Sequence, residues 1–238
     1  VKYSAGNYCV CVGAYISADA ARAAGSQLNI AQSWDVTSGT AYTVAVVKTG
    51  TDKILCEFEY GTKHPFAVQP IATSSAKTET YFTGSRYFGG FQYQRIDGGK
   101  LTVVNFVDVE DYVKGVIPYE MSASWPVEAL KAQAICARTY LMSSLNRHSS
   151  RGFDLCNTTD CQVYYGQNSA NANSNGAVDG TAGQYLMYKG TLCQTFFYAS
   201  NGGASENCEN VWYANLGYLR GKTDPYEAKS ADNVSGYY

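Results

Sequence analysis

The acidic side chains give the first indication of what chemistry this chain can perform. Asp108, Glu110 and Asp111 lie within one short segment. A fourth carboxylate, Glu120, lies between a proline and a tryptophan in the stretch VIPYEMSASWP. No G-x-S-x-G, H-E-x-x-H, G-x-G-x-x-G or G-x-x-x-x-G-K-[ST] motif occurs, so serine-nucleophile, zinc-protease and nucleotide chemistry are unsupported. What remains is acid chemistry, in which a carboxyl group donates a proton to a leaving group.

Two cations follow Glu120 at a spacing that places them on one face of a helix. Lys131 and Arg138 are seven residues apart, which is about two helical turns. Both could point at a groove edged by Glu120. Alternatively, Lys131 pairs with Glu128 three residues before it, while Arg138 anchors a buried loop carboxylate, because Lys and Arg are rarely buried unpaired. Spacing alone favours the second arrangement.

The eight cysteines allow disulfides in an oxidising compartment, but a chain of 238 residues can bury enough apolar surface to fold without them. Cys136 lies in an apolar helical pattern and is predicted to be a buried free thiol. Only Cys156 and Cys161 lie close together in a polar loop, CNTTDC. This pair is the candidate for metal binding or for a disulfide.

The composition is that of a globular protein, with 45% hydrophobic and 16% charged residues. A net charge of −2 without runs of Lys or Arg predicts no nucleic-acid partner. No apolar stretch approaches the roughly 18 residues that a membrane span needs. The 21 tyrosines suit a polar ligand such as a glycan, since each combines an apolar ring with a hydroxyl, although a tyrosine-rich β surface explains them equally well.

The elements that would position these residues are of mixed type. Alternation at Tyr8, Val10 and Val12 predicts a strand, and an Ala-rich helix capped by Ser17 or Asp19 follows. Segments 41–50 and 53–61 are predicted strands, which completes a small β-α-β-β unit over residues 1–75. The pattern YCVCVGAYISADAA resembles, weakly, the sporulation-related repeat, a peptidoglycan-binding module.

The second unit is predicted over residues 76–238. Segment 81–121 is rich in β-forming residues, and DGGK between FQYQRI and LTVVNFV indicates a hairpin. A helix is predicted from Ser124, as N-cap, to Leu145, and most of the last third again favours β structure. The expected fold is therefore α+β, with a mostly antiparallel β body around one long buried helix and a smaller N-terminal β-α-β-β part.

Several long motifs resemble the stage II sporulation protein D family. They are VKGVIPYEMSASWPVEALKAQAICARTY, FDLCNTTDCQVYYG, FYASNGGASE and YLRGKTDPYE, which together cover roughly residues 81–227. The family includes lytic transglycosylases, which cleave peptidoglycan glycan strands, and amidase-enhancer relatives. The resemblance implies that Glu120, in the P-x-E-M motif, is the catalytic acid. Apolar neighbours such as Ile117, Met121 and Trp125 would raise its pKa by desolvation.

The resemblance also implies substrate-binding residues. Lys131 and Arg138 occupy family positions, and the other expected contacts are hydrogen-bonding or stacking residues of groove motifs: Gln162, Tyr164, Tyr198, Ser200 and Asn201. Asn201 stands where the family usually has serine. Some family members hold zinc with one His and two Cys, which implies His148, Cys156 and Cys161 here, and the family often has histidine where Asp160 stands. Zinc, a disulfide and free thiols remain open; zinc would be structural, because the acid chemistry requires no cofactor.

Two functions are consistent with these residues. The first is a lytic transglycosylase that cuts peptide-stripped glycan strands and forms 1,6-anhydro-N-acetylmuramic acid. The second is a non-catalytic peptidoglycan-binding module that enhances a partner amidase, an N-acetylmuramoyl-L-alanine amidase. The intact P-x-E-M motif favours the enzyme. Either function implies an extracytoplasmic location, with an upstream signal or anchor before Val1.

Overall fold

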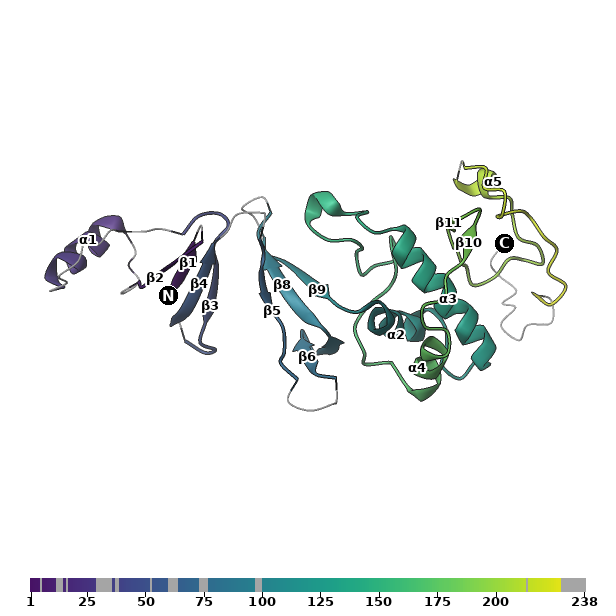
Figure 1. Cartoon of the computed structure of the whole chain (residues 1–238), viewed down its shortest axis with the longest axis horizontal. Coiled ribbons are helices and arrows are strands. Elements are labelled where there is room, and N and C mark those ends of the chain that lie inside the picture. The colour runs from purple at the N-terminus through teal and green to yellow at the C-terminus, as the bar shows by residue number, and fades with distance from the viewer. Residues whose placement is uncertain are drawn as a thin grey trace.

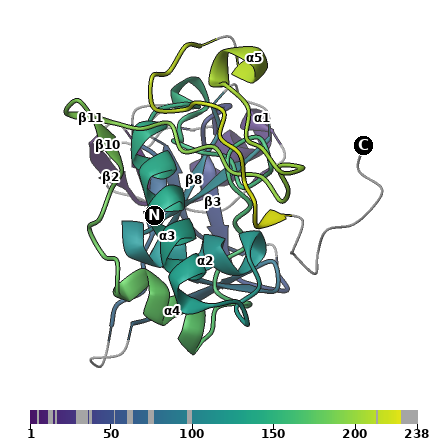
Figure 2. The ribbon, with the colours of Figure 1, turned by 90° about the vertical axis from the view of Figure 1, so that its right-hand side faces the viewer.

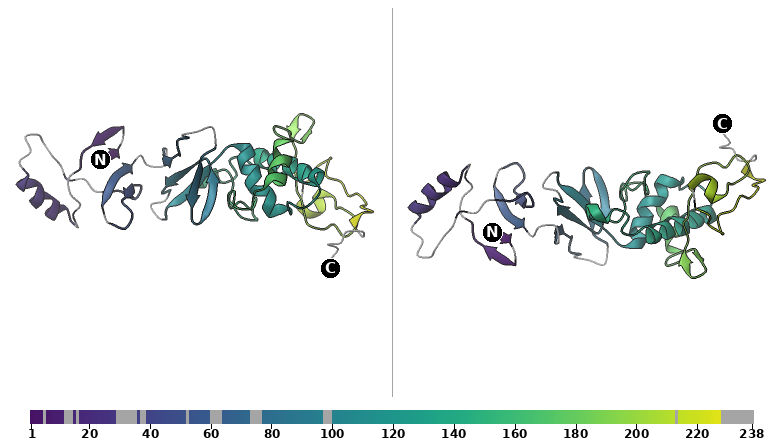
Figure 3. Two further views of the ribbon diagram at one scale, coloured as in Figure 1. Left: turned by 90° about the horizontal axis from the view of Figure 1, so that it is seen from below. Right: turned by 90° about the horizontal axis from the view of Figure 1, so that it is seen from above.

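The computed structural model describes residues 1–4, 6–11, 15, 17–28, 36, 39–51, 53–59, 64–72, 77–96, 100–212 and 214–227. Helices and small sheets are mixed in the described chain, which confirms the predicted α+β class. The elements follow one another along the long axis, from an N-terminal sheet through a second sheet to a group of helices and a C-terminal segment (Figures 1 and 3).

The N-terminal sheet contains the predicted small unit with one added strand. Its elements are β1 (Lys2–Ser4), β2 (Asn7–Cys9), α1 (Ala18–Gln27), β3 (Val44–Val47) and β4 (Ile54–Glu59), with strand order β2-β1-β4-β3. β1 pairs antiparallel with β2 and parallel with β4. Ser17 is the N-cap of α1, and its hydroxyl accepts a hydrogen bond from the backbone N–H of Ala20 at 3.2 Å. Val12, part of the predicted first strand, lies outside the described residues.

The second sheet leads the chain to the helices. It contains β5 (Phe66–Val68), β8 (Gly90–Gln94) and β9 (Thr102–Phe106), and a separate hairpin is formed by β6 (Glu79–Phe82) and β7 (Ser85–Phe88). β8 and β9 pair antiparallel, as the hairpin signal predicts, although residues 97–99 of its turn lie outside the described chain. β5 precedes the predicted boundary at residue 75 and pairs with β8 beyond it. The two-unit division stays a prediction.

Helix α2 (Val109–Glu120) corrects the β prediction for the end of segment 81–121. Asp108 caps this helix, since its carboxylate accepts a hydrogen bond from the N–H of Glu110 at 2.9 Å. Val113, Val116 and Ile117 fall on one face and are fully buried. β-branched and aromatic residues favour strands in isolation, but here the helical spacing of these apolar residues and the cap determine the outcome.

Helix α3 (Val127–Ser143) is shorter than the predicted 124–145. The predicted N-cap is wrong: Pro126 occupies that position, and the Ser124 hydroxyl bonds that of Ser122 at 2.9 Å. The predicted core face is present, because four of its residues are buried: Leu130, Ala134, Ala137 and Leu141. Leu145 lies beyond the helix and is exposed. Proline at this position lacks only its own backbone N–H, and no side chain caps the start of this helix.

The last third of the chain is not mostly β, contrary to the prediction. It contains α4 (Ala172–Asp179), the short strands β10 (Met187–Tyr188) and β11 (Thr191–Leu192), and α5 (Cys208–Trp212). Beyond β11, side chains rather than a β ladder satisfy much of the backbone. Asn201 accepts from the N–H of Gly203, Asn207 from Gly221 and Ser205 from Lys222. Figure 2, which faces this end of the chain, shows these yellow-green loops above and to the right of α3.

The main core lies where the helices meet the second sheet. Its buried members come from α2, α3 and α4, together with β7, β8 and the segment after Cys161: Val113, Val116, Ile117, Leu130, Ala134, Ala137, Leu141, Ala177, Val178, Tyr87, Phe91, Tyr112 and Tyr164. Within the described chain, no helix has the length and apolar character needed to cross a bilayer.

A glycine in α2 allows the closest of these contacts. A Cβ at Gly115 would lie 2.4 Å from Cε2 of Tyr164, so the ring packs directly on the helix backbone. We expect Gly115→Ala to lower the free energy of unfolding by about 1–3 kcal/mol, because neither the ring nor the helix can move freely. Chemical denaturation at neutral pH measures the change.

Gly176→Ala is the matched control, since Gly176 is also inside a helix, α4, but its Cβ would meet nothing within 4 Å. That variant should be unchanged or more stable by about 0.4–1 kcal/mol, because alanine reduces the entropy of the unfolded chain. Equal stability changes at the two glycines would contradict the packing argument.

Candidate functional site

Glu120 is the last residue of α2, and its side chain is half-buried. Burial raises the pKa of its carboxyl group, and a hydrogen bond from the backbone N–H of Val163 acts in the opposite direction. The negative end of the helix dipole also disfavours the carboxylate. The expected rise in the pKa of Glu120 is thus confirmed. Ile117, one turn earlier, is fully buried, whereas Trp125 is 44% exposed.

Val163 reaches Glu120 because the chain on either side of it is fixed to the helices. Gln162 accepts a hydrogen bond from the Tyr112 hydroxyl at 3.2 Å and donates to the carbonyl of Ala137 at 3.3 Å. Gln167 donates to the carbonyl of Asp111, in the first turn of α2, at 2.8 Å. The segment 162–167 therefore lies along α2. Its first residue is held to both α2 and α3, and its last residue is held to α2.

Two predicted substrate-binding residues are core residues instead. Gln162 is 1% exposed and Tyr164 is 6% exposed. The hydroxyl of Tyr164 donates to Oδ1 of Asn105 on β9 at 2.9 Å, and its ring lies 4.8 Å from that of Tyr112. Neither side chain faces solvent, so neither can bind a glycan in this conformation. Their role is to hold the backbone that presents Val163.

Arg138 is also buried, with none of its surface exposed. Its guanidinium donates to both carboxylate oxygens of Glu110, with the shortest N–O distance 2.7 Å, and also to the carbonyls of Val178 and Gln184. Between the two alternatives for this residue, the structure shows the anchor for a carboxylate, but Glu110 lies in the first turn of α2 rather than in a loop, and its side chain is 23% exposed. A group without exposed surface does not meet a dissolved substrate.

Lys131 forms the other predicted pair. Its Nζ lies 2.8 Å from Oε1 of Glu128, three residues earlier on α3. Its side chain is 34% exposed, and that of Glu128 is 77% exposed. Surface pairs of this kind contribute little to stability. A glycan can therefore compete for this ammonium, and the substrate-binding role of Lys131 stays a prediction.

Tyr198, Ser200 and Asn201 belong to a C-terminal loop. Tyr198 is 60% exposed, the Ser200 hydroxyl bonds the carboxylate of Glu227, and the Asn201 amide donates to Asp224 at 2.9 Å. In the described chain these hydrogen bonds connect the loop to residues 224–227 and not to Glu120. The structure thus brings Val163 to Glu120, but it does not join this loop to the carboxyl group by a direct bond.

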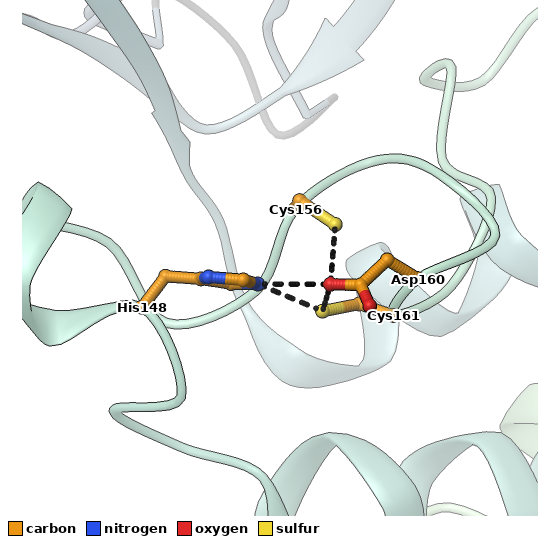
Figure 4. Close-up of side chains that lie close together, drawn as sticks. All are labelled: His148, Cys156, Asp160 and Cys161. Carbon is orange, nitrogen blue, oxygen red and sulfur yellow. Dashed lines mark hydrogen bonds and ion pairs between the residues drawn. The ribbon is translucent and has the colours of Figure 1, made fainter.

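The predicted metal residues do come together, with one addition. One ligand atom each of His148, Cys156, Asp160 and Cys161 lies within 4.8 Å of all the others (Figure 4). Nε2 of His148 lies 3.2 Å from Sγ of Cys161 and 3.5 Å from Oδ2 of Asp160. Both cysteines are free thiols rather than a disulfide. One imidazole, two thiols and one carboxylate form a donor set that fits tetrahedral zinc.

The sequence did not predict the roles of three groups at these sites. Asp160 lies inside the CNTTDC loop, and its position next to Cys161 was the available signal, since carboxylates also bind zinc. Glu110 was recognised as acidic but not as the partner of Arg138. The backbone N–H of Val163 has no sequence signal, because any non-proline residue supplies one.

The burial of Arg138 gives a testable difference from Lys131. We expect Arg138→Met to lower the free energy of unfolding by about 3 kcal/mol, because Glu110 loses its partner while remaining mostly covered. Lys131→Met, which breaks an exposed pair, should change it by less than about 1 kcal/mol. Urea denaturation of both variants measures this, and a small loss for Arg138→Met would show that the pair does not anchor α2.

Comparison with known proteins supports the resemblance described above. The family model described as Stage II sporulation protein matches residues 97–188. The chain is 42% identical over 148 residues to an uncharacterized protein of Brachyspira hyodysenteriae, a match covering 61% of this chain and 40% of that protein. It is 45% identical over 112 residues to an amidase enhancer of Bacillus subtilis, covering 47% of this chain and 15% of the enhancer.

A third relative carries the name of the family itself. It is the stage II sporulation protein D of Bacillus amyloliquefaciens, 31% identical over 144 residues, which cover 53% of this chain and 41% of that protein. The chain thus spans less than half the length of each of these relatives. The matched segment 97–188 contains Glu120, Val163 and the four residues of the candidate metal cluster. Residues 97–188 thus match the family model described as Stage II sporulation protein, and the chain is similar to a stage II sporulation protein D.

Proposed function

We propose that this protein is a peptidoglycan lytic transglycosylase in which Glu120 is the catalytic acid and then the catalytic base. The observation that carries the proposal is the half-buried carboxyl group of Glu120, whose pKa is raised by burial, at the end of α2. An ordinary exposed glutamate would be ionised at neutral pH and could not donate a proton. The match of the surrounding segment to the family model supports this role.

The proposed reaction needs one carboxyl group used twice. Protonated Glu120 donates its proton to the glycosidic oxygen between N-acetylmuramic acid and N-acetylglucosamine as the C1–O bond breaks. The resulting carboxylate takes the proton from the 6-hydroxyl of the muramic acid, and O6 bonds C1 to close the 1,6-anhydro ring. Glu120 is thereby protonated again by the proton from the 6-hydroxyl, and no water is consumed. Hydrolytic glycosidases, by contrast, use a pair of carboxylates.

The surroundings of Glu120 suit both halves of this cycle. Burial and the helix terminus favour the protonated form that must start the reaction. The N–H of Val163 favours the carboxylate that exists between the two proton transfers. The two influences act in opposite directions, and the net effect is a raised pKa for Glu120.

The substrate proposed is the glycan strand stripped of its stem peptides, and the protein acts outside the cytoplasmic membrane, where peptidoglycan is found. Three predicted substrate-binding side chains keep polar or aromatic groups partly accessible: Lys131, Tyr198 and Ser200. Lys131 could bind the lactyl carboxylate of muramic acid, since an ammonium favours an anion. Asn201 supports the loop of Ser200 through its bonds to Gly203 and Asp224.

A second function is favoured by one comparison. The 45% identity to the amidase enhancer of Bacillus subtilis supports a role in which the chain binds peptidoglycan and stimulates a partner amidase. Tyr198, Val211 and Trp212 are each more than half exposed, and such side chains are typical of recognition surfaces. Under this alternative Glu120 would make no difference to the stimulated rate.

We also propose that the cluster of His148, Cys156, Asp160 and Cys161 binds one structural Zn²⁺. The metal would join His148, which follows α3, to Cys161. Because Cys161 directly precedes Gln162, this would fix the start of segment 162–167. It would thereby stiffen the backbone that presents Val163. The proton transfers assigned to Glu120 need no metal.

The decisive experiment on function compares the protein with Glu120→Gln on purified glycan strands, with and without stem peptides. Products are read by mass spectrometry. We expect 1,6-anhydro-muramic ends from the unaltered protein on peptide-free strands, and a loss of at least about 1,000-fold in rate for the variant, because glutamine cannot donate a proton. Glu57→Gln, in β4 of the N-terminal sheet, is the control and should keep full activity.

The same assay separates the alternatives. Reducing ends lost in Glu120→Gln would retain the acid but make the enzyme a hydrolase. Equal stimulation of an amidase by both proteins, without strand cleavage, would establish the enhancer. For the transglycosylase, the rate should fall as pH rises through the raised pKa of Glu120, since only its protonated form donates.

Metal binding is tested by elemental analysis after the protein is equilibrated with zinc and dialysed. We expect about one zinc per chain, and a marked loss with Cys161→Ser, which removes a thiolate ligand. Cys56→Ser, in β4, is the matched control and should bind the same amount. The melting temperature should fall when a chelator removes the metal. Full zinc content in Cys161→Ser would disprove the assigned ligand set.

A further inference from the structure

The segment 162–167 has a buried side and a solvent side, and Tyr164, which was predicted to contact a sugar, lies on the buried side. Gln162 and Tyr164 are buried against the helices, whereas Val163 is half-buried and Tyr165 is 45% exposed. More buried and more exposed residues therefore alternate over positions 162–165, and Tyr165 lies on the solvent side of this stretch. It follows Val163, the residue whose N–H bonds Glu120, by only two positions.

Tyr165 does not stand alone on this side. Its ring lies 5.3 Å from the ring of Tyr119, at an interplanar angle of 86°. Tyr119 is half-buried and directly precedes Glu120 on α2. Two aromatic rings, one from each of the segments that meet at Glu120, therefore contact edge to face. In such a contact, one face of the more exposed ring is not used by its partner.

The position of Tyr165 is held by a tight turn after it. Gly166 has φ +78°, and a Cβ there would lie 2.1 Å from the backbone oxygen of Arg86. The same oxygen accepts a hydrogen bond from the N–H of Gln167 at 2.7 Å. The hydroxyls of Tyr119 and Tyr165 are also close enough to that of Tyr87 to add to the rise that burial causes in the pKa of Tyr87. Tyr165 is thus exposed but fixed at its base.

We propose that Tyr165, supported by Tyr119, is a sugar-stacking subsite beside Glu120. Its ligand class is the pyranose ring of a peptidoglycan amino sugar, whose C–H face packs on an aromatic ring while its hydroxyls and acetamido group stay solvated. This assignment rests on the proposed function for the identity of the glycan. It replaces Tyr164 as the stacking residue and places the bound ring next to the proton donor.

Binding is measured separately from cleavage to test the subsite. Isothermal titration with peptide-free glycan strands is performed in the Glu120→Gln background, so that the ligand is not consumed. We expect Tyr165→Ala to weaken binding about 10-fold, through loss of the stacking surface. The affinity of Tyr165→Phe should lie within about twofold of that of the Glu120→Gln parent, because stacking uses the ring and not the hydroxyl. Unchanged melting temperatures show that the variants fold.

Tyr81→Ala is the matched control, since Tyr81 is 70% exposed on β6. Its affinity should equal that of the parent. Equal affinity of Tyr165→Ala and the parent would overturn the subsite, and so would a parent that binds no glycan. If the unaltered protein forms no anhydro ends but Tyr165→Ala still weakens binding, the transglycosylase proposal fails and the subsite stands. If anhydro ends form and Tyr165→Ala binds normally, the subsite fails and the transglycosylase proposal stands.

Discussion

The ion pair between Arg138 and Glu110 is the constraint on which the helical part of the molecule depends. A fully buried guanidinium needs hydrogen-bond acceptors, and here the carboxylate of Glu110 and the carbonyls of Val178 and Gln184 accept from all three of its nitrogens. These partners come from the first turn of α2, the end of α4 and the loop after α4. The pair therefore fixes three elements relative to α3 at one point, through hydrogen bonds that lose their strength if any element shifts.

The catalytic candidate inherits its position from this arrangement. Glu110 and Glu120 lie at opposite ends of α2, about 15 Å apart along a rigid helix, so anchoring one end determines where the other lies. Halfway along, Gly115 lets Tyr164 pack on the backbone, and the neighbouring chain brings the N–H of Val163 to Glu120. Several residues that look functional in the sequence thus hold the site together, while the proposed chemistry uses a carboxyl group and a backbone amide.

How far the sequence predicts this structure depends on whether a feature is local. The helical spacing of Leu130, Ala134 and Ala137 identified α3, and the P-x-E-M motif identified Glu120. Helix α2 was missed, because Val and Tyr prefer strands unless tertiary packing selects a helix. The Lys131 pair was predictable from a spacing of three, whereas Gln162 and Tyr164 required knowledge of which side faces the helices. The grouping of His148 with Asp160 and the two cysteines depends on the fold and not on local sequence.

The alternation at 162–167 also limits how this part of the chain can change length. Cys161 at one end belongs to the candidate metal cluster, and Gly166 at the other makes a turn that only glycine fits. Four residues lie between these fixed points. Inserting or deleting one would exchange the two sides, burying Tyr165 and exposing Tyr164, and would move the amide of Val163 away from Glu120. Homologous chains should therefore tolerate many substitutions on the outer side of this segment, but very few changes in its length.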